Sequence, residues 1–514
     1  MNFFISAANT NSLTIGSTLI AILMVLTFAF VLVAVCLSAK YAGVAKSDSV
    51  KVGKLKPICI LGIIGVLGII IRILFVFLIN GYGYDYSEAY GVANSLRTNN
   101  GFLKYTTTYL GTGPLIGYIY AAFGSLGLAF NLSKDALFMQ LLLKLPYVLA
   151  DIAACAFLYF AVSKYSNKYM ALTISGLYFL SPLFFTMSSI WGSPISIYAL
   201  ILLLIGYFFL SKNVFGLVCA TAAGLLCDAT FIFIGIIVAA YLIYLLVIAI
   251  IEIIKNKPSL DAIAKDNTYG NVYFAPICLL LGFMMIYLLS LPAFFADGVI
   301  GIGDVYSQLF IKPLDFNSSS GSLTQFSRNG LGIFTLFLQN NMEIGEKFPK
   351  LLYSGIILAL SLALMLITFL NKKNRANLLL IASFVWATVA VYFVGAVEWS
   401  LAPSLIVLLL AFAVIKDKRI LHVFLMLSSL VLLNALFVML GGEQFGMTLV
   451  PDKFLMNEDG LFSIFSIVLS VLTVLAHVFF AVVTLDISLT KHRVTFSTDV
   501  DSGIGECIKN WYRG

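Results

Sequence analysis

Charged side chains are scarce in this sequence. Only 11% of the 514 residues are Asp, Glu, Lys or Arg, whereas 61% are hydrophobic and the mean hydropathy is +1.02. Soluble domains carry about 25% charged residues, so this composition excludes an ordinary soluble protein. In a bilayer every backbone polar group must be satisfied within the protein, which favours helices as spanning elements. We therefore predict an all-α fold, a polytopic transmembrane helical bundle.

Histidine and cysteine are also rare, with three and seven residues respectively. Six cysteines fall within long apolar stretches and Cys507 lies in the C-terminal tail, so no disulfide framework or Cys/His ligand set can be assembled. His422 and His477 lie in apolar stretches and His492 follows the last of them. No phosphate-cradling glycine loop is present either. The sequence therefore predicts no metal site and no cofactor.

Long apolar runs are abundant instead. A spanning helix needs about 20 apolar residues, and by this rule the sequence predicts thirteen spans. They cover approximately residues 14–38, 57–80, 137–162, 168–186, 191–211, 213–229, 231–254, 272–296, 350–371, 377–394, 400–416, 419–440 and 461–486. The first of these is too long for a secretory signal and has no charged N-terminal flank, so we expect it to be retained.

The spans divide the chain into three parts. Residues 1–56 form an N-terminal anchor span with a basic inner loop, residues 57–486 a transmembrane domain, and residues 487–514 a tail. Within the transmembrane domain, two long polar intervals at 81–136 and 297–350 separate groups of spans.

The distribution of Lys and Arg orients the chain. If the apolar piece 114–130 does not cross the membrane, the loops on one side hold 21 Lys and Arg and the opposite loops hold 8. Because the more basic side of a membrane protein faces the cytoplasm, we predict an outer N-terminus, a cytoplasmic C-terminus and an outer-face juxtamembrane helix at 114–130. The net charge of +7 arises mostly from this bias and gives no support for a nucleic-acid partner.

The interval Gly81–Pro114 is the first long polar stretch between spans. It holds Asp85 and Glu88 within a few residues of the end of the second predicted span. A carboxylate placed there lies at the mouth of any cavity that the helices form, and a positioned carboxylate can accept a proton from an attacking hydroxyl. Asp85 and Glu88 are therefore candidate catalytic residues.

This interval resembles the first outer loop of the membrane-embedded glycosyltransferases of the C superfamily (GT-C), which take a sugar from a polyprenyl phosphate and include the protein O-mannosyltransferases. In bacterial members, Gly-Tyr-x-x-Asp is followed by Trp-Ala-x-x-Leu, a Tyr, Asp-Tyr-Pro-Pro and a Gly-Tyr-x-Tyr helix on the membrane surface. The matching residues here are Gly81, Tyr82, Asp85, Ala93, Asn94, Ser95, Leu96, Tyr105, Pro114, Gly117, Tyr118 and Tyr120. Leu110-Gly111-Thr112-Gly113 stands where the family has most of its Asp-Tyr-Pro-Pro motif.

Further matches follow in the family's order over most of residues 57–410. They are the Lys-x-Pro…Asp pattern at Lys144, Pro146 and Asp151, the Trp-Gly pair at Trp191 and Gly192, the asparagines Asn329 and Asn340, and the Glu-x-x-Leu-x-Pro pattern at Glu398, Leu401 and Pro403. Several polar positions differ from the family, namely Ser193 and Ile195 in place of Gln and Asp, Cys227-Asp228-Ala229 in place of Lys-Pro-Gln, and Val397, Trp399 and Ser400 in place of His, Arg and Tyr.

The resemblance implies a metal-independent, inverting transfer on the outer face, with Asp85 as base. Candidates for binding the donor and its phosphate are Arg72, Arg97, Lys104, Lys144, Trp191, Arg328, Asn329 and Glu398. Lys144 and Asp151 are about 10 Å apart along one helix and cannot pair directly, so another helix must supply their partners. Asp228 is a candidate partner for Arg72 or Lys144, and an Arg such as Arg72 near the end of a span otherwise snorkels or pairs with an acid.

The expected partners are a polyprenyl-phosphate-linked sugar donor, the lipid bilayer, and a glycan, lipid or protein acceptor. The expected location is the cell membrane, with the active side outward. The altered polar motifs leave a second interpretation open, a non-catalytic relative that acts as the partner or scaffold of an active enzyme. A lipid-linked-sugar transporter is a third, although the sequence has no internal repeat or paired broken helices of the transporter kind.

Overall fold

The computed structural model describes most of the predicted transmembrane domain. The described residues are 57–78, 83–98, 113–134, 136–259, 267–295, 298–311, 327–328, 330–338, 355–357, 359–360, 362–364, 366–367, 375–393, 395–441, 464–490 and 494. The predicted anchor span 14–38, the loop 39–56 and residues 495–514 of the tail lie outside this set.

The described chain is helical almost throughout, which confirms the all-α prediction. The elements are α3 (Pro57–Leu78), α4 (Gly83–Thr98), α6 (Pro114–Ala129), α7 (Leu137–Tyr165), α8 (Lys168–Phe179), α9 (Pro182–Phe185), the π-helix η2 (Thr186–Trp191), α10 (Ile195–Ser211), α11 (Val214–Cys227), η3 (Ala229–Phe231), α12 (Ile232–Asn256), α14 (Asn267–Phe294), α15 (Ile302–Tyr306), η5 (Ser307–Ile311), β1 (Ser327–Arg328), η6 (Phe334–Leu336), α18 (Arg375–Tyr392), β2 (Ala396–Val397), α19 (Ala402–Ile415), α20 (Lys418–Gly441) and α21 (Ile464–Leu489).

The protein is a multi-pass membrane protein. Six of the described helices are long and apolar enough to cross a bilayer, and the bent pair formed by α8 with α9 and η2 would make a seventh. Shorter apolar helices include α6, α10, α11 and α19. The count of thirteen spans therefore stays a prediction.

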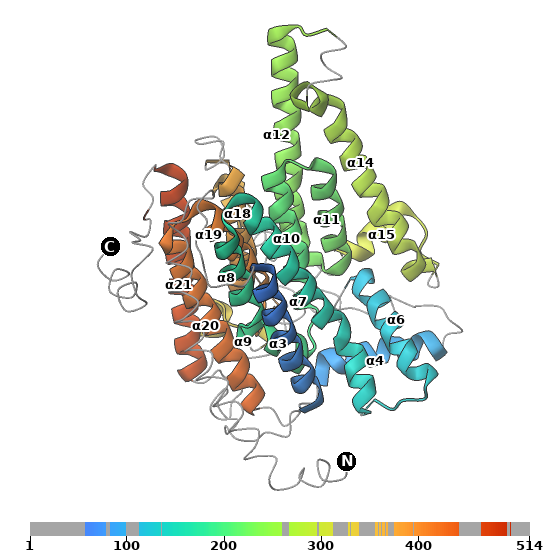
Figure 1. Ribbon diagram of the computed structural model, residues 1–514. Coiled ribbons are helices and arrows are strands. Elements are labelled where there is room, and N and C mark those ends of the chain that lie inside the picture. Colours follow the sequence, from blue (N-terminus) through green and yellow to red (C-terminus); the bar gives the residue numbers. More distant parts are fainter. Residues whose placement is uncertain are drawn as a thin grey trace.

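The helix α19 forms the centre of the bundle. Every residue of α19 except Val414 is buried, as expected for a helix that is hydrophobic on all sides. It packs against α10, α18 and α20, whereas α3, α12, α14 and α21 lie at the periphery (Figure 1). The pair α12 and α14 extends at one end beyond the other helices (Figure 1).

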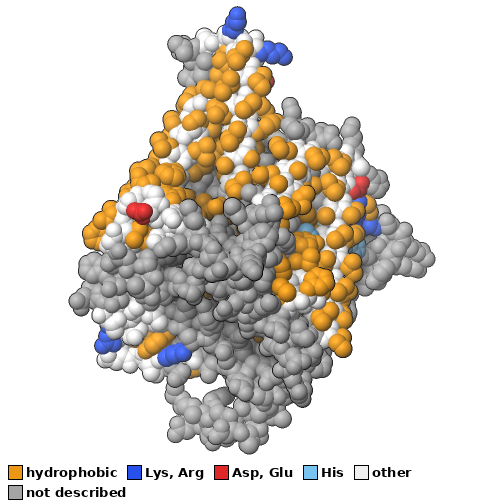
Figure 2. All heavy atoms as spheres, turned by 180° about the vertical axis from the view of Figure 1, so that it is seen from behind, with side chains coloured by type: hydrophobic (Ala, Val, Ile, Leu, Met, Phe, Trp, Pro, Cys, Tyr) orange, Lys and Arg blue, Asp and Glu red, His pale blue; other side chains and the backbone are white. Residues whose placement is uncertain are grey.

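The peripheral helices expose apolar side chains over most of their length. Figure 2 shows hydrophobic side chains along this extended region, with basic side chains at its tip, where Lys255 and Lys257 are exposed. On α3, the exposed residues Val66, Ile70 and Ile73 recur at helical spacing. Such continuous apolar surface marks contact with a membrane or a partner, and in this chain it faces the lipid bilayer.

The predicted span 168–186 is not one straight helix. The helix α8 ends at Phe179, and the chain resumes at Pro182 with a bend of 44°. Proline has no backbone N–H to continue the hydrogen-bond ladder and its ring clashes with the preceding turn, which accounts for the break. The bend directs η2 toward the predicted outer face, where it ends at Trp191 and Gly192.

The predicted juxtamembrane segment 114–130 forms the single helix α6. It packs against α4, α7, α11 and α14, and the Gly113 N–H donates to the Cys227 carbonyl at 2.7 Å just before α6 begins. A Cβ on Gly113 would lie 2.2 Å from the Leu226 carbonyl oxygen, so only glycine fits here. The Tyr118 hydroxyl donates to the Leu289 carbonyl at 2.8 Å. These contacts fix α6 against the bundle, and its place on the outer membrane surface stays a prediction.

Labelling of a Ser125→Cys variant tests this placement. In a background without the native cysteines, a membrane-impermeant maleimide should label residue 125 from the outside and never from the inside, because α6 is predicted to lie on the outer face without crossing the bilayer. A Lys257→Cys variant, at an exposed position on the predicted inner side, should show the opposite pattern. Labelling of residue 125 from the inside would mean that α6 crosses.

Candidate functional site

The end of η2 is a buried turn that presents Trp191. Trp191 is fully buried, and the chain reverses at Gly192, which has a left-handed φ of +72°. Only glycine adopts this conformation without steric cost. The π-helical winding of η2 is itself unusual, and such segments occur frequently at functional sites. The predicted Trp-Gly motif therefore lies where a π-helix ends in a left-handed glycine, two uncommon backbone conformations in succession.

Lys144 of α7 lies directly against this turn. A Cβ built on Gly192 would be 3.1 Å from Cγ of Lys144, so the absence of a side chain at 192 leaves room for the lysine. Lys144 is 1% exposed, and Gln140, one turn earlier on the same face of α7, is 3% exposed. A buried ammonium group inside a membrane protein is costly and commonly marks a functional position.

The late motif around Glu398 meets the same turn. The rings of Trp191 and Trp399 pack edge to face with centroids 4.3 Å apart, although the two residues are far apart in the sequence. Glu398, next to Trp399, is 2% exposed. The structure thus brings together the segments that carry Trp191–Gly192, Lys144 and Glu398. Their order in the sequence does not reveal this proximity.

Two hydrogen bonds hold the segment that carries Glu398. Ser400 Oγ accepts from the Val397 N–H at 2.9 Å, and Nε1 of Trp386 on α18 donates to the Ser400 carbonyl at 2.9 Å. In addition, β1 pairs in parallel with β2, with Arg328 opposite Val397. The backbone of the predicted donor-binding residue Arg328 therefore lies beside the Glu398 segment. The Arg328 side chain and Asn329 are outside the described residues.

The predicted base Asp85 lies in the first turn of α4, where only its backbone is described. The end of α3 packs against α9, where the ring of Phe75 stacks on that of Phe185 with centroids 5.5 Å apart. The five residue steps from Leu78 to Gly83 span at most about 17 Å, so α4 begins within that distance of the end of α3. At about 100° per residue, position 85 falls on the same side of α4 as the buried Ala89 and Val92.

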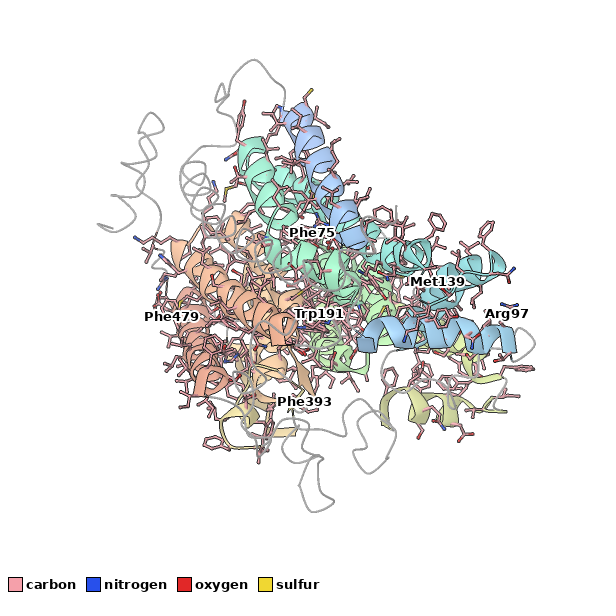
Figure 3. The ribbon with its side chains drawn as sticks, turned by 90° about the horizontal axis from the view of Figure 1, so that it is seen from below. Phe75, Arg97, Met139, Trp191, Phe393 and Phe479 are labelled. Atoms are coloured by element: carbon pink, nitrogen blue, oxygen red, sulfur yellow. The ribbon has the colours of Figure 1, made fainter. Side chains whose placement is uncertain are left out.

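The remaining predicted residues of the first outer loop are placed apart from this turn or outside the described chain. Arg97 is exposed at the far end of α4, and Figure 3 shows it at the edge of the molecule, away from Trp191. Position 88 follows position 85 by about one turn of α4, and only its backbone is described. Lys104 lies outside the described residues.

Arg72 forms a buried ion pair that joins three helices. Its Nε donates to Asp151 Oδ2 at 3.1 Å, and Nη2 approaches the same oxygen to 3.0 Å without hydrogen-bond alignment. Nη1 donates to the carbonyls of Gly68 (3.2 Å) and Phe179 (2.9 Å). Tyr178 donates its hydroxyl proton to Asp151 Oδ1 at 2.9 Å. Both charged side chains are fully buried.

This ion pair accounts for the packing at the bend after α8. Phe179 is the last residue of α8, so its carbonyl has no partner within the helix, and the Arg72 guanidinium satisfies it while stacking 3.9 Å above the Phe179 ring. The expectation that another helix supplies the partner of Asp151 is confirmed. The suggested pairing of Arg72 with Asp228 is wrong.

Asp228 has a local structural contact instead. Its Oδ1 accepts from the backbone N–H and the hydroxyl of Thr230, both at 2.7 Å, and so caps η3 at the start of the next span. A short acidic side chain at an N-cap satisfies backbone donors that have no helical partner. The sequence signal for this role is an Asp two residues before a Thr at a break between apolar runs.

The Gly192 turn is sensitive to a single methyl group. Gly192→Ala places a Cβ at positive φ and against Lys144. We therefore expect the free energy of unfolding to fall by about 1–2 kcal/mol and any activity that depends on Lys144 to decrease. Thermal unfolding in detergent measures the first effect. Gly62→Ala on α3, where a Cβ meets nothing within 4 Å, is the matched control. Equal unfolding temperatures for the two variants would contradict the placement of Lys144 against Gly192.

Within the described part of the chain, no group of three or more His, Cys, Asp or Glu side chains could hold a metal ion. The polar side chains of the site are Lys144, Gln140 and Glu398, with the indoles of Trp191 and Trp399 between the segments. This combination suits binding of an anionic, partly apolar ligand, because a buried cation and amide can contact an anion while aromatic rings contact a sugar or a prenyl chain.

No protein-family model matches the chain, and no curated protein matches it. Among solved structures, the chain is similar to the oligosaccharyltransferase of Archaeoglobus fulgidus in its apo form, with a TM-score of 0.41 and 13% sequence identity. The alignment covers 90% of this chain and 60% of the archaeal protein, so the chain spans less than two thirds of its length. This degree of similarity is too low to assign a fold family or an activity to the chain.

Proposed function

We propose that this protein is an integral membrane glycosyltransferase that moves a sugar from a polyprenyl-phosphate donor to an acceptor on the outer face of the cell membrane. The observation that carries the proposal is the meeting of three sequence motifs at one buried turn. Lys144 lies against Gly192, and Trp191 packs on Trp399 beside Glu398. Lys144, Trp191, Gly192 and Glu398 are positions at which the sequence resembles the glycosyltransferases, and the three motifs that carry them lie far apart in the sequence.

In the proposed reaction an acceptor hydroxyl attacks the anomeric carbon of the donor sugar. The new carbon–oxygen bond forms on the face opposite the phosphate, the sugar–phosphate bond breaks, and polyprenyl phosphate leaves with the bonding electrons. Asp85 accepts the hydroxyl proton. The Lys144 ammonium stabilises the leaving phosphate, an interaction that is strong in a site from which water is excluded. The backbone of Arg328 lies beside the same segment in β1, Asn329 follows it in the sequence, and Glu398 binds the sugar.

Arg72 has a positioning role in this proposal. All its described contacts are to Asp151, Gly68 and Phe179, so it holds α3, α7 and α8 in register below the site. Because α4 follows directly after α3, the same ion pair sets where Asp85 lies.

A non-catalytic relative is the second candidate function. It is favoured by Trp399, which replaces a cationic residue of the family and packs on Trp191. It is also favoured by Cys227-Asp228, which has an acid and no cation where the family has Lys-Pro, and whose Asp228 caps η3. Such a protein would retain the fold and the surfaces of an enzyme while lacking part of its phosphate-binding charge.

Donor binding and donor cleavage, measured together, separate the two functions from each other and from transport. The purified protein in nanodiscs should bind at least one member of a panel of polyprenyl-phosphate hexoses and pentoses, and Lys144→Met should weaken that binding at least tenfold. Lys134→Met, at a surface loop outside the site, should leave binding unchanged. Binding of no member of the panel would contradict the proposed donor site. Binding without cleavage of the sugar–phosphate bond would favour the scaffold, and movement of the donor between leaflets without cleavage would show a transporter.

A further inference from the structure

The interface between α18 and α21 carries buried polar groups that the proposed function does not use. Two side-chain contacts fix its register. Thr388 Oγ1 lies 3.0 Å from His477 Nε2, and the rings of Phe384 and Phe480 pack with centroids 5.4 Å apart. Residue numbers fall along α18 as they rise along α21, so the two helices are antiparallel.

This register brings three polar residues to within about one helical turn of each other at one end of the interface. Asn377 is seven residues from Phe384, and Thr484 is seven residues from His477, so each lies on the face that contacts the other helix. Continuing the pairing of Thr388 with His477 along both helices places Asn377 opposite Ser488. The three side chains of Asn377, Thr484 and Ser488 thus converge at the end of the bundle that we predict to be cytoplasmic.

These side chains are buried, and within the described part of the chain their polar atoms have no hydrogen-bond partner. Asn377 is 1% exposed, and Thr484 and Ser488 are fully buried. The amide oxygen and nitrogen of Asn377 and both hydroxyls have no hydrogen-bond partner among the residues that the structure describes. Hydroxyls on helices normally donate to the carbonyl four residues earlier, as Thr473 on the same helix does to Leu469 at 2.8 Å.

The charged groups at this end do not supply the missing partners. Arg419 of α20 binds Asp417 through Nε (3.0 Å) and Nη2 (2.9 Å), and its Nη1 binds Asp486 of α21. The backbone N–H of Val494 donates to Asp417 as well. The members of this cluster satisfy one another, and Arg419 links α20 to α21 at this end.

We propose that Asn377, Thr484 and Ser488 form an internal water-binding site between α18 and α21. Buried polar groups in native proteins are almost always hydrogen-bonded to protein or to ordered water, and a buried water needs two to four polar partners. Water fits this set because it can accept from Nδ2 of Asn377 and donate to Oδ1 or to a hydroxyl. A monovalent cation would contact the three oxygens but leave Nδ2 without an acceptor.

The site has a structural consequence for the rest of the molecule. It ties α21 to the first turns of α18, and the opposite end of α18 holds the Glu398 segment through Trp386 and Ser400. The bridge therefore anchors the helix that positions one side of the candidate site. The inference does not depend on the proposed glycosyltransferase activity.

A double-mutant cycle in thermal unfolding tests the shared water. Asn377→Leu and Thr484→Val should each lower the unfolding temperature by about 2–4 °C, because each leaves the other groups of the site with fewer partners. The double variant should lose clearly less than the sum. Thr473→Val, whose hydroxyl is satisfied within its own helix, should combine additively with Asn377→Leu. Additive losses for Asn377→Leu with Thr484→Val would overturn the proposal.

A density map of the wild-type protein, bound to a rigid antibody fragment for cryo-electron microscopy, decides the matter even if the variants fold poorly. We expect solvent density within hydrogen-bond distance of Asn377 and at least one of the two hydroxyls. A protein side chain in that place, or no density there, would contradict the site. An unfolding temperature that rises with sodium chloride but not with choline chloride would show a cation site instead of water.

Discussion

Asp85→Asn is expected to reduce sugar transfer by about 100-fold or more while leaving the protein folded and inserted. Asn is nearly isosteric with Asp but cannot accept the proton of the attacking hydroxyl, and a positioned base contributes roughly 10²–10⁴-fold to such a reaction. Donor binding should be unchanged, because the proposed phosphate contact is Lys144. Initial rates of transfer at saturating donor, together with donor affinity, measure both effects.

The matched control is Asp304→Asn on α15. Asp304 is an exposed acid on the predicted outer side, so its substitution should leave the rate within twofold of wild type. Full activity of the Asp85 variant would remove Asp85 as the base. Glu88→Gln would then be the next variant, because position 88 follows 85 by about one helical turn on α4.

Removal of one partner from the Arg72–Asp151 pair is expected to have the largest effect on stability. Arg72→Met leaves the Asp151 carboxylate buried with only the Tyr178 hydroxyl as a described donor and deprives the Phe179 carbonyl of its partner. Breaking a buried ion pair on one side costs about 3–5 kcal/mol. We expect Arg72→Met to lower the folded yield strongly, which unfolding in detergent and size-exclusion profiles will measure.

The double variant Arg72→Met with Asp151→Leu should recover part of that loss, because replacing both charges removes the uncompensated carboxylate. The free energy of unfolding of Arg97→Met, at the exposed end of α4, should lie within about 0.5 kcal/mol of the wild-type value. A single Arg72→Met variant as stable as the Arg97 control would mean that the pair does not form.

Helix positions were predictable from the sequence because the bilayer constrains both composition and length. The predicted span 137–162 corresponds to α7 (Leu137–Tyr165), and the predicted span 461–486 corresponds to α21 (Ile464–Leu489). The bend in 168–186 was less accessible. Pro182 is visible in the sequence, yet a proline in an apolar run can kink, break or merely start a helix, and the choice depends on whether a residue such as Arg72 can satisfy the freed carbonyl.

The candidate site was predictable in its members but not in its contacts. The sequence singled out Lys144, Trp191 and Glu398, and the structure places their segments together. It did not reveal that Trp399, noted only as a departure from the family, packs on Trp191. The sequence also gave no means of choosing between Asp151 and Asp228 as the partner of Arg72. Pairing between helices depends on how each helix is rotated and how deep each residue lies in the membrane, and apolar periodicity alone does not fix either.

The most direct test of the central claim is release of polyprenyl phosphate by the purified protein in nanodiscs, followed over time with a panel of polyprenyl-phosphate sugars and acceptors, for the wild type and Asp85→Asn. We predict acceptor-dependent release by the wild type with at least one donor, and none above background for the variant. Donor binding without release by the wild type across the whole panel would contradict the enzyme and favour the scaffold.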